Sequence, residues 1–194
     1  MRGAGTSAVA LNLIVAVEAI GTQLFPIATC RLYSGCLCQS CDGAMHPLLT
    51  IGYEQALPDA VLGELKRAKV DLVVDTRAVA ASRRPGFSKR QLAASLDELG
   101  IAYLHLQKLG TPAEGRQAAR SGDLATLWRI YDKHIKTPDA QNALDELIAL
   151  LKSGKRVCLL CYERDPNECH RSRIAALVKK RTRVKVEDLI PPLF

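Results

Sequence analysis

The residues with the clearest chemical potential lie near the C-terminus, in the stretch LCYERDPNECHR that spans residues 160–171. A thiol, an imidazole and a guanidinium follow one another at Cys169, His170 and Arg171, where the pattern predicts that a helix begins. A thiol in the first turn of a helix lies near unpaired backbone N–H groups, which favour the thiolate. The same position binds anions without any chemistry at the sulfur. We therefore expect this turn to belong to a catalytic or anion-binding site, with Cys169 as a candidate nucleophile.

Other residues of the same stretch offer different chemistry. Glu163 directly follows an apolar run that ends at Cys161, and burial there would raise its pKa toward that of a general base. It can equally hold an arginine in place. Successive residues of a helix point in different directions, so Cys169, His170 and Arg171 cannot all face one ligand. His170 is the one that we expect to anchor the loop.

The elements that position these residues follow an alternating pattern of strands and helices. Apolar runs at 48–52, 70–75, 101–106, 156–161 and 184–189 are typical of buried strands. Apolar residues at helical spacing predict helices that begin near Pro58, Ser88, Leu124, Pro138 and Cys169, and residues 107–122 are predicted to be a loop. This alternation predicts an α/β fold, a three-layer sandwich with a mainly parallel β-sheet flanked by helices.

Polar residues that follow different strands should meet, because a parallel sheet binds ligands beyond the carboxyl ends of its strands. The second predicted strand ends at Asp75 and Arg77 and leads to Ser82 and Arg83, while His105 ends the third. Asp75 is a candidate for proton transfer, and Arg77 and Arg83 are candidates for holding an anion. Asp75 and Arg77 can equally form a structural ion pair, and for His105 we expect packing.

The charge distribution favours an anionic partner. The chain carries a net charge of +7, and residues 1–44 contribute none of it because their two basic and two acidic residues cancel. Residues 76–96 contain five lysines and arginines and no acid. A basic field of this kind suits phosphates, nucleotides or nucleic acid, although a solvated surface explains the net charge equally well. The apolar run at 8–17 is too short to span a membrane, so we expect no membrane partner.

The cysteines of the main body indicate reduced thiols in the cytoplasm. Cys158 and Cys161 lie on or at the end of an apolar strand, which does not suggest a disulfide framework. Cys161, Cys169, His170 and His105 are suitable metal ligands, but two cysteines with seven residues between them and a histidine directly after the second are not a familiar zinc spacing. No glycine-rich phosphate loop is present. We expect no metal and no cofactor.

The first 44 residues differ from the rest of the chain. They contain four closely spaced cysteines that can hold zinc, namely Cys30, Cys36, Cys38 and Cys41. Met45 is followed at once by HPLLTIGYEQ, which reads like the start of a parallel-sheet protein. We therefore expect residues 1–44 to be disordered or to result from an upstream start assignment. Residues 45–194 are expected to form a single α/β domain.

Four segments together resemble a known family. They read TIGYE, DLVVDTRAVAASRRPGF, LGIAYLHLQKLG and VCLLCYERDPNECHRSRIAALV, and they run in order from about Leu49 to Val178. They are similar to the bacterial and archaeal family called domain of unknown function 488, or DUF488. The resemblance implies a cytoplasmic, single-domain α/β protein but no established reaction. It places nine residues on the family's motif positions: Asp75, Arg77, Ser82, Arg83, Cys161, Glu163, Cys169, His170 and Arg171.

The chain departs from the family pattern in two loops. Relatives often have a proline soon after the Asp-x-Arg element, where this chain reads Ala78-Val79-Ala80-Ala81. Many relatives carry a second glycine where Thr111-Pro112 follows Gly110 here. Both departures affect loops, so we expect the fit to a substrate to differ.

These features together predict an enzyme that acts on a phosphate-bearing or nucleotide-like substrate at the carboxyl ends of the strands. Cys169, Glu163 and Asp75 are the candidates for the chemistry. The candidates for binding are Arg77, Ser82, Arg83, Arg171, His170 and Cys161. Two alternatives are a nucleic-acid-binding module without catalysis and a thiol- or metal-dependent redox protein. The sequence does not indicate an oligomeric state.

Overall fold

A computed structural model of the chain describes residues 45–193. The predictions about residues 1–44, namely the disorder, the start site and the zinc-binding cysteines, lie outside the described residues. Five strands form one sheet in the order β3-β2-β4-β1-β5, and every neighbouring pair is parallel. They are β1 (Leu48–Gly52), β2 (Leu72–Asp75), β3 (Ala102–His105), β4 (Val157–Cys161) and β5 (Val186–Leu189). The predicted α/β sandwich with a parallel sheet is confirmed.

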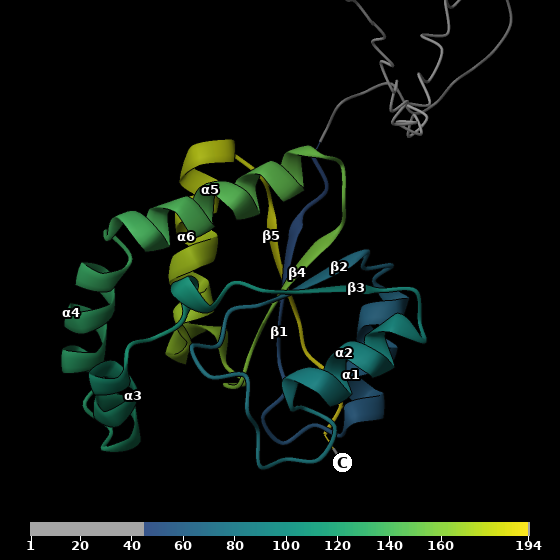
Figure 1. Cartoon of the computed structure of the whole chain (residues 1–194), viewed down its shortest axis with the longest axis horizontal. Helices are drawn as coiled ribbons and strands as arrows, with labels where there is room; N and C mark the ends of the chain where they lie inside the picture. The colour runs from purple at the N-terminus through teal and green to yellow at the C-terminus, as the bar shows by residue number, and fades with distance from the viewer. Residues whose placement is uncertain (1–44, 194) are drawn as a thin grey trace, which may run out of the picture. The chain divides into compact units, whose positions relative to one another are not determined.

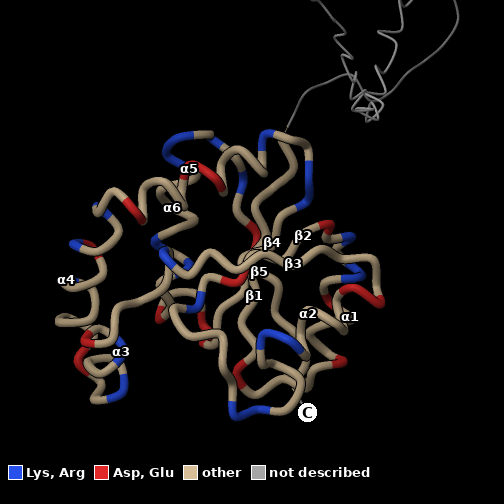
Figure 2. The backbone as a smooth tube through the Cα atoms, viewed as in Figure 1, with Lys and Arg blue, Asp and Glu red and all other residues tan. Residues whose placement is uncertain are grey.

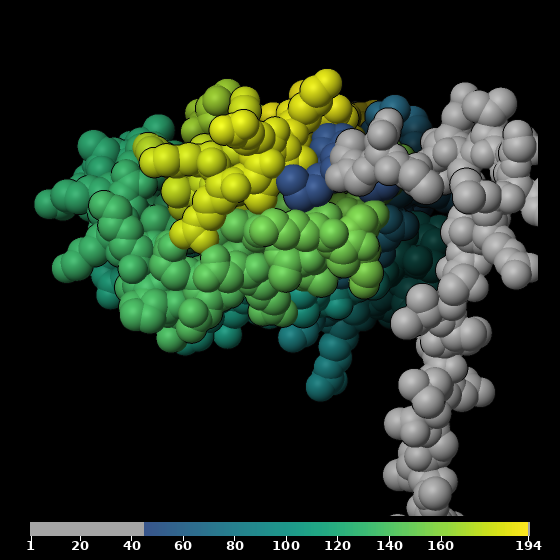
Figure 3. All heavy atoms as spheres, turned by 90° about the horizontal axis from the view of Figure 1, so that it is seen from above, coloured from purple at the N-terminus to yellow at the C-terminus, as the bar shows by residue number. Residues whose placement is uncertain are grey.

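Helices cover both faces of the sheet (Figure 1). The helices α1 (Pro58–Arg67) and α2 (Lys89–Asp97) lie on one face, and α5 (Pro138–Lys152) and α6 (His170–Thr182) lie on the other. In the space-filling view of Figure 3, α6 lies directly against α5. Two further helices, α3 (Ala113–Arg120) and α4 (Leu124–His134), pack against each other. Short 3₁₀ turns, η1 (Gln107–Leu109) and η2 (Pro166–Glu168), complete the described chain.

Two apolar cores explain why the strands are apolar throughout. Side chains alternate across a strand, so Val157 and Leu159 pack against α5 and α6 while Cys158 and Leu160 pack against α1 and α2. Each residue of β1, β2 and β4 is buried. A strand that is covered on both faces has no polar side to reveal its pleat, which is typical of parallel sheets. None of the helices within residues 45–193 is long and apolar enough to cross a membrane.

The predicted loop at 107–122 is wrong, because the structure places η1 and α3 there. The helix α3 begins directly after Pro112 and contains mostly good helix formers, but Gly115 interrupts the pattern in the sequence. Gly115 is buried, and an added Cβ would lie 2.8 Å from the Cγ2 atom of Thr111. The glycine therefore lets Thr111 pack closely against the helix. In the sequence alone, the same glycine reads as a helix-breaking signal.

The end of β1 brings the segment after β4 close to the sheet. An added Cβ on Gly52 would overlap the backbone carbonyl oxygen of Glu163. The backbone N–H of Glu54 donates to the Tyr162 carbonyl at 2.8 Å, and the Arg164 N–H donates to the Glu54 carboxylate at 3.1 Å. A residue without a side chain is therefore required where these two loops meet.

Replacing Gly52 with alanine should destabilise the protein by about 1–3 kcal/mol, because the added methyl group displaces backbone and not a flexible side chain. Gly63→Ala is the matched control, since Gly63 lies in α1 with nothing within 4 Å of an added Cβ. That control should gain about 0.5–1 kcal/mol from helix propensity. Chemical unfolding of both variants measures the difference, and equal stability of Gly52→Ala and the unsubstituted protein would contradict the close contact.

Candidate functional site

A cavity of about 490 Å³ opens where the carboxyl ends of β1, β2 and β4 meet. Tyr53 follows β1, residues 77–84 follow β2, Cys161 ends β4, and Tyr162 and Glu163 follow it. Thr111 and two arginines of α3 form another wall, and His170 closes it from the start of α6. This is the place at which open parallel sheets bind ligands.

The nine residues predicted from the sequence surround this cavity in two layers. Six of them line it: Arg77, Ser82, Arg83, Cys161, Glu163 and His170. The other three lie behind it and are at most 1% exposed: Asp75, Cys169 and Arg171. All nine residues therefore lie near the carboxyl ends of the strands. Their positions in the sequence do not show which of them a ligand can touch and which of them hold the walls.

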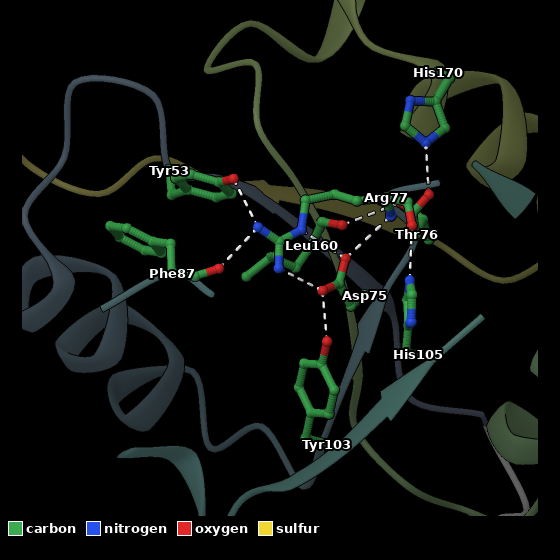
Figure 4. Close-up of polar contacts among 9 residues, drawn as sticks. All are labelled: Tyr53, Asp75, Thr76, Arg77, Phe87, Tyr103, His105, Leu160 and His170. Carbon is green, nitrogen blue, oxygen red and sulfur yellow. Dashed lines mark hydrogen bonds and ion pairs between the residues drawn. The ribbon is translucent and has the colours of Figure 1, made fainter. Parts of the chain in front are cut away.

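Asp75 and Arg77 form a buried ion pair that organises the loop after β2 (Figure 4). The Arg77 guanidinium donates to both carboxylate oxygens of Asp75, at 2.9 and 2.6 Å. It also donates to the Tyr53 hydroxyl at 2.7 Å and to the Phe87 carbonyl at 2.9 Å, while Tyr103 donates its hydroxyl to Asp75 at 2.6 Å. Burial alone would lower the pKa of Arg77, but Asp75 outweighs it and raises that pKa. Most of the guanidinium's donors are therefore used within the protein.

Arg171 forms a second buried anchor on the other side of the cavity. Its Nε donates to the Thr50 hydroxyl at 3.1 Å. One terminal nitrogen donates to the Glu163 carbonyl and the other donates to the Arg164 carbonyl at 2.8 Å. Thr50 in turn donates to Asp188 on β5 at 2.5 Å. Arg171 therefore fixes the backbone that carries Glu163 and does not face the cavity.

Two thiols, a carboxyl and an imidazole form a compact cluster at the floor of the cavity. The Cys161 sulfur lies 3.0 Å from a Glu163 carboxyl oxygen and 3.6 Å from His170 Nδ1. The Cys169 sulfur lies 3.9 Å from the same nitrogen, and it accepts the Arg171 backbone N–H at 3.5 Å. His170 Nε2 lies 3.0 Å from the Thr76 carbonyl oxygen (Figure 4). Because a carbonyl oxygen only accepts, Nε2 carries a proton and Nδ1 faces the two sulfurs.

Within the cluster, the pKa values of the two thiols shift in opposite directions. Burial alone would raise the pKa of Cys169, but the neighbouring Cys161 thiol and the positive charges of His170 and Arg171 hold it well below its usual value. Burial, followed by the nearby Cys169, raises the pKa of Cys161 well above its usual value. Burial would lower the pKa of His170, but Cys169 and Glu163 outweigh it and raise that pKa. These shifts favour the thiolate form of Cys169 over that of Cys161, and they favour the protonated form of His170.

Among the described residues that line the cavity, Glu163 is the only acidic one, and it is half-buried. Burial and the negative charge of Cys169 raise the pKa of its carboxyl to about 7. The carboxyl accepts a hydrogen bond from Cys161, while Arg171 holds its backbone carbonyl. This residue therefore presents a carboxyl group to the cavity from a fixed position.

Three arginines of the cavity wall are not among the site residues predicted from the sequence, namely Arg84, Arg116 and Arg120. Arg116 and Arg120 are four residues apart on α3 and so share one face of that helix. This spacing is visible in the sequence, but it has no meaning in a segment that is predicted to be a loop. Basic and acidic residues are interspersed over much of the described chain (Figure 2), although residues 179–185 also form a basic run without an acid.

The comparison with protein families confirms the resemblance seen in the sequence. The chain matches the family model described as "Domain of unknown function DUF488" over residues 58–178. This match covers more than half of the chain, so the protein belongs to the DUF488 family. No curated protein and no solved structure matches the chain. The family assignment supplies no reaction, and the site itself must support any functional argument.

Replacing Arg171 with lysine should destabilise the protein by about 1–3 kcal/mol for each acceptor that loses its partner, because one ammonium cannot reach all three acceptors. Arg173→Lys is the matched control, since Arg173 lies on the same helix, is half exposed and forms a 3.8 Å ion pair with Asp132 and a cation–π contact with Trp128, both of which a lysine can keep. Denaturant unfolding compares the two variants. Equal losses in both would show that Arg171 does not hold the segment that carries Glu163.

Proposed function

We propose that the protein is a cytoplasmic enzyme that acts on a phosphate-bearing or nucleotide-like substrate bound in this cavity. The observation that carries the proposal is the charge of the lining. Five arginines face one carboxyl group, and the arginines are Arg77, Arg83, Arg84, Arg116 and Arg120. Guanidinium groups bind phosphate through paired hydrogen bonds. A volume of about 490 Å³ is within the range of small-molecule sites.

The arginines do not contribute equally. Arg77 is committed to Asp75, Arg84 donates to the Ala56 carbonyl at 2.7 Å, and Arg116 donates to the Thr111 carbonyl at 2.8 Å. Arg83 and Arg120 are exposed, and within residues 45–193 their side chains form no hydrogen bond or ion pair. We assign the first contact with an anionic ligand to these two side chains.

Glu163 is the residue to which we assign proton transfer. Within residues 45–193 it supplies the only carboxyl group of the lining, and the Arg171 and Gly52 contacts fix its backbone. Cys169 does not line the cavity and is fully buried, so we assign it a supporting electrostatic role and not direct attack on the substrate. Asp75 is similarly buried beneath Arg77 and acts by positioning that loop.

The binding part of the proposal predicts a loss of affinity when the free arginines are removed. Arg83→Gln and Arg120→Gln should each weaken binding of inorganic phosphate or a nucleoside monophosphate by roughly 10-fold, the effect of losing a charge-assisted hydrogen bond. Arg90→Gln is the matched control, because Arg90 is an exposed arginine of α2 that does not line the cavity. Calorimetric titration measures all three, and an equal loss in the control would reduce the effect to net charge.

The catalytic part of the proposal predicts a loss of turnover when the carboxyl is removed. Glu163→Gln should reduce hydrolysis or transfer of a phosphorylated substrate by roughly 10²–10⁴-fold while it retains binding of the same compound. Glu168→Gln is the control, since Glu168 is exposed and does not line this cavity. A panel of phosphate esters and nucleotides identifies the substrate. Unchanged turnover in Glu163→Gln would refute the assigned role.

A further inference from the structure

The cluster at the floor of the cavity has the donor atoms of a metal site. The sulfurs of Cys161 and Cys169, a carboxyl oxygen of Glu163 and a ring nitrogen of His170 all lie within 4.8 Å of one another. Three of these four residues are buried, so the group is not an exposed acidic patch. Sulfur and imidazole nitrogen are the donors that zinc prefers in proteins.

We propose that Cys161, Cys169 and His170 bind a zinc ion through two sulfurs and Nδ1, with the remaining coordination position open to the cavity beside Glu163. In a tetrahedral zinc site, zinc–sulfur and zinc–nitrogen bonds of about 2.3 and 2.0 Å place a sulfur about 3.6 Å from a nitrogen. The sulfurs of Cys161 and Cys169 lie 3.6 and 3.9 Å from His170 Nδ1. These two separations are close to those of a tetrahedral site, and the two sulfurs lie within 4.8 Å of each other.

Contacts outside the cluster orient the ligands as a metal site requires. The other ring nitrogen of His170 donates to the Thr76 carbonyl at 3.0 Å, so Nδ1 is the nitrogen that faces the two sulfurs and binds an ion once it is deprotonated. The Cys169 sulfur accepts the backbone N–H of Arg171 at 3.5 Å, a contact that stabilises a thiolate. The ring of Tyr131 packs 5.4 Å from the imidazole and limits its rotation. These contacts hold the ligands in place before any ion binds.

The open side of the site follows from the positions of the ligands. Cys161, Glu163 and His170 line the cavity, whereas Cys169 does not and is fully buried. An ion between them is therefore covered by Cys169 on the inner side and reached from the cavity on the outer side. Three protein ligands with one open position are typical of catalytic zinc sites. A zinc-bound water would then lie beside Glu163, and this last step rests on the proposed function.

The spacing in the sequence predicts no metal, and the proposal departs from that prediction because of η2. This turn folds residues 162–168 back on themselves, so Cys169 returns to the end of β4 where Cys161 lies. Common zinc spacings describe ligands on short hairpin turns, and they do not apply to a loop that leaves a strand and re-enters beside it. Cys158, a third buried thiol on the same strand, packs in the opposite core and is not part of the cluster.

Zinc binding by the full chain tests the proposal. Cys30, Cys36, Cys38 and Cys41 are replaced with serine in the background, because their thiols could bind zinc of their own. With a phosphine reductant present and a competing chelator, we expect about one zinc per chain. Cys161→Ala, Cys169→Ala and His170→Gln should each weaken zinc binding more than the roughly 10–100-fold loss typical of an outer contact. Cys158→Ala is the matched control and should retain zinc.

Two further measurements complete the test. Glu163→Gln should retain zinc within a few-fold, and a loss as large as that of Cys161→Ala would overturn the three-ligand assignment. Cobalt added to the serine background, with the proposed ligands intact, should give thiolate-to-cobalt charge-transfer absorption and the strong visible bands of tetrahedral cobalt. Absence of stoichiometric zinc, absence of these bands or an equal loss in Cys158→Ala would overturn the proposal. None of these readouts uses a substrate, so their failure and failure of the proposed enzyme activity are separate results.

Discussion

The buried guanidinium of Arg171 is the constraint on which the rest of the site depends. It is 1% exposed and donates to the Thr50 hydroxyl in the sheet and to the carbonyls of Glu163 and Arg164 in the loop after β4. Burying a charge costs free energy unless polar partners compensate, so the loop must stay where its carbonyls meet the guanidinium. Gly52 allows that approach. As a result Glu163 faces the cavity, and Cys169 and His170 return to the end of β4.

The cavity lies between two buried arginines that have the same structural role, because each holds one of the loops that form its walls. Arg77 holds the loop after β2 through Asp75, Tyr53 and Phe87, and Arg171 holds the loop after β4. His170 links the two sides, because its ring reaches from the start of α6 to the Thr76 carbonyl. Arg77 and Arg171 are used to hold the two loops, so Arg83 and Arg120 are the arginines left free to bind a ligand. The arginine-rich composition of the site therefore combines two physical roles that residue type alone does not distinguish.

The sequence predicts the strands and the candidate site residues, but it does not predict which of these residues are structural. Apolar periodicity predicts the strands and most helices, and β1 occupies the predicted residues 48–52, because burial on both faces leaves a clear pattern. The helix α3 is missed because Gly115 is required by packing, which only the folded structure reveals. The rule that parallel sheets bind ligands at the carboxyl ends of their strands identifies the nine candidate residues. It cannot predict which of them are buried, since the burial of Asp75, Cys169 and Arg171 depends on contacts across the sheet.

The charge of the cluster connects the proposed metal site with the proposed anion site. A thiol that binds zinc does so as the thiolate, and an imidazole binds through a free lone pair, so zinc binding releases protons from the cluster. With zinc, two thiolates balance the divalent ion and the imidazole is neutral, so the three ligands and the ion sum to zero charge. The bound ion would therefore change the chemistry at the floor of the cavity, while the arginines of the walls remain available to an anionic ligand.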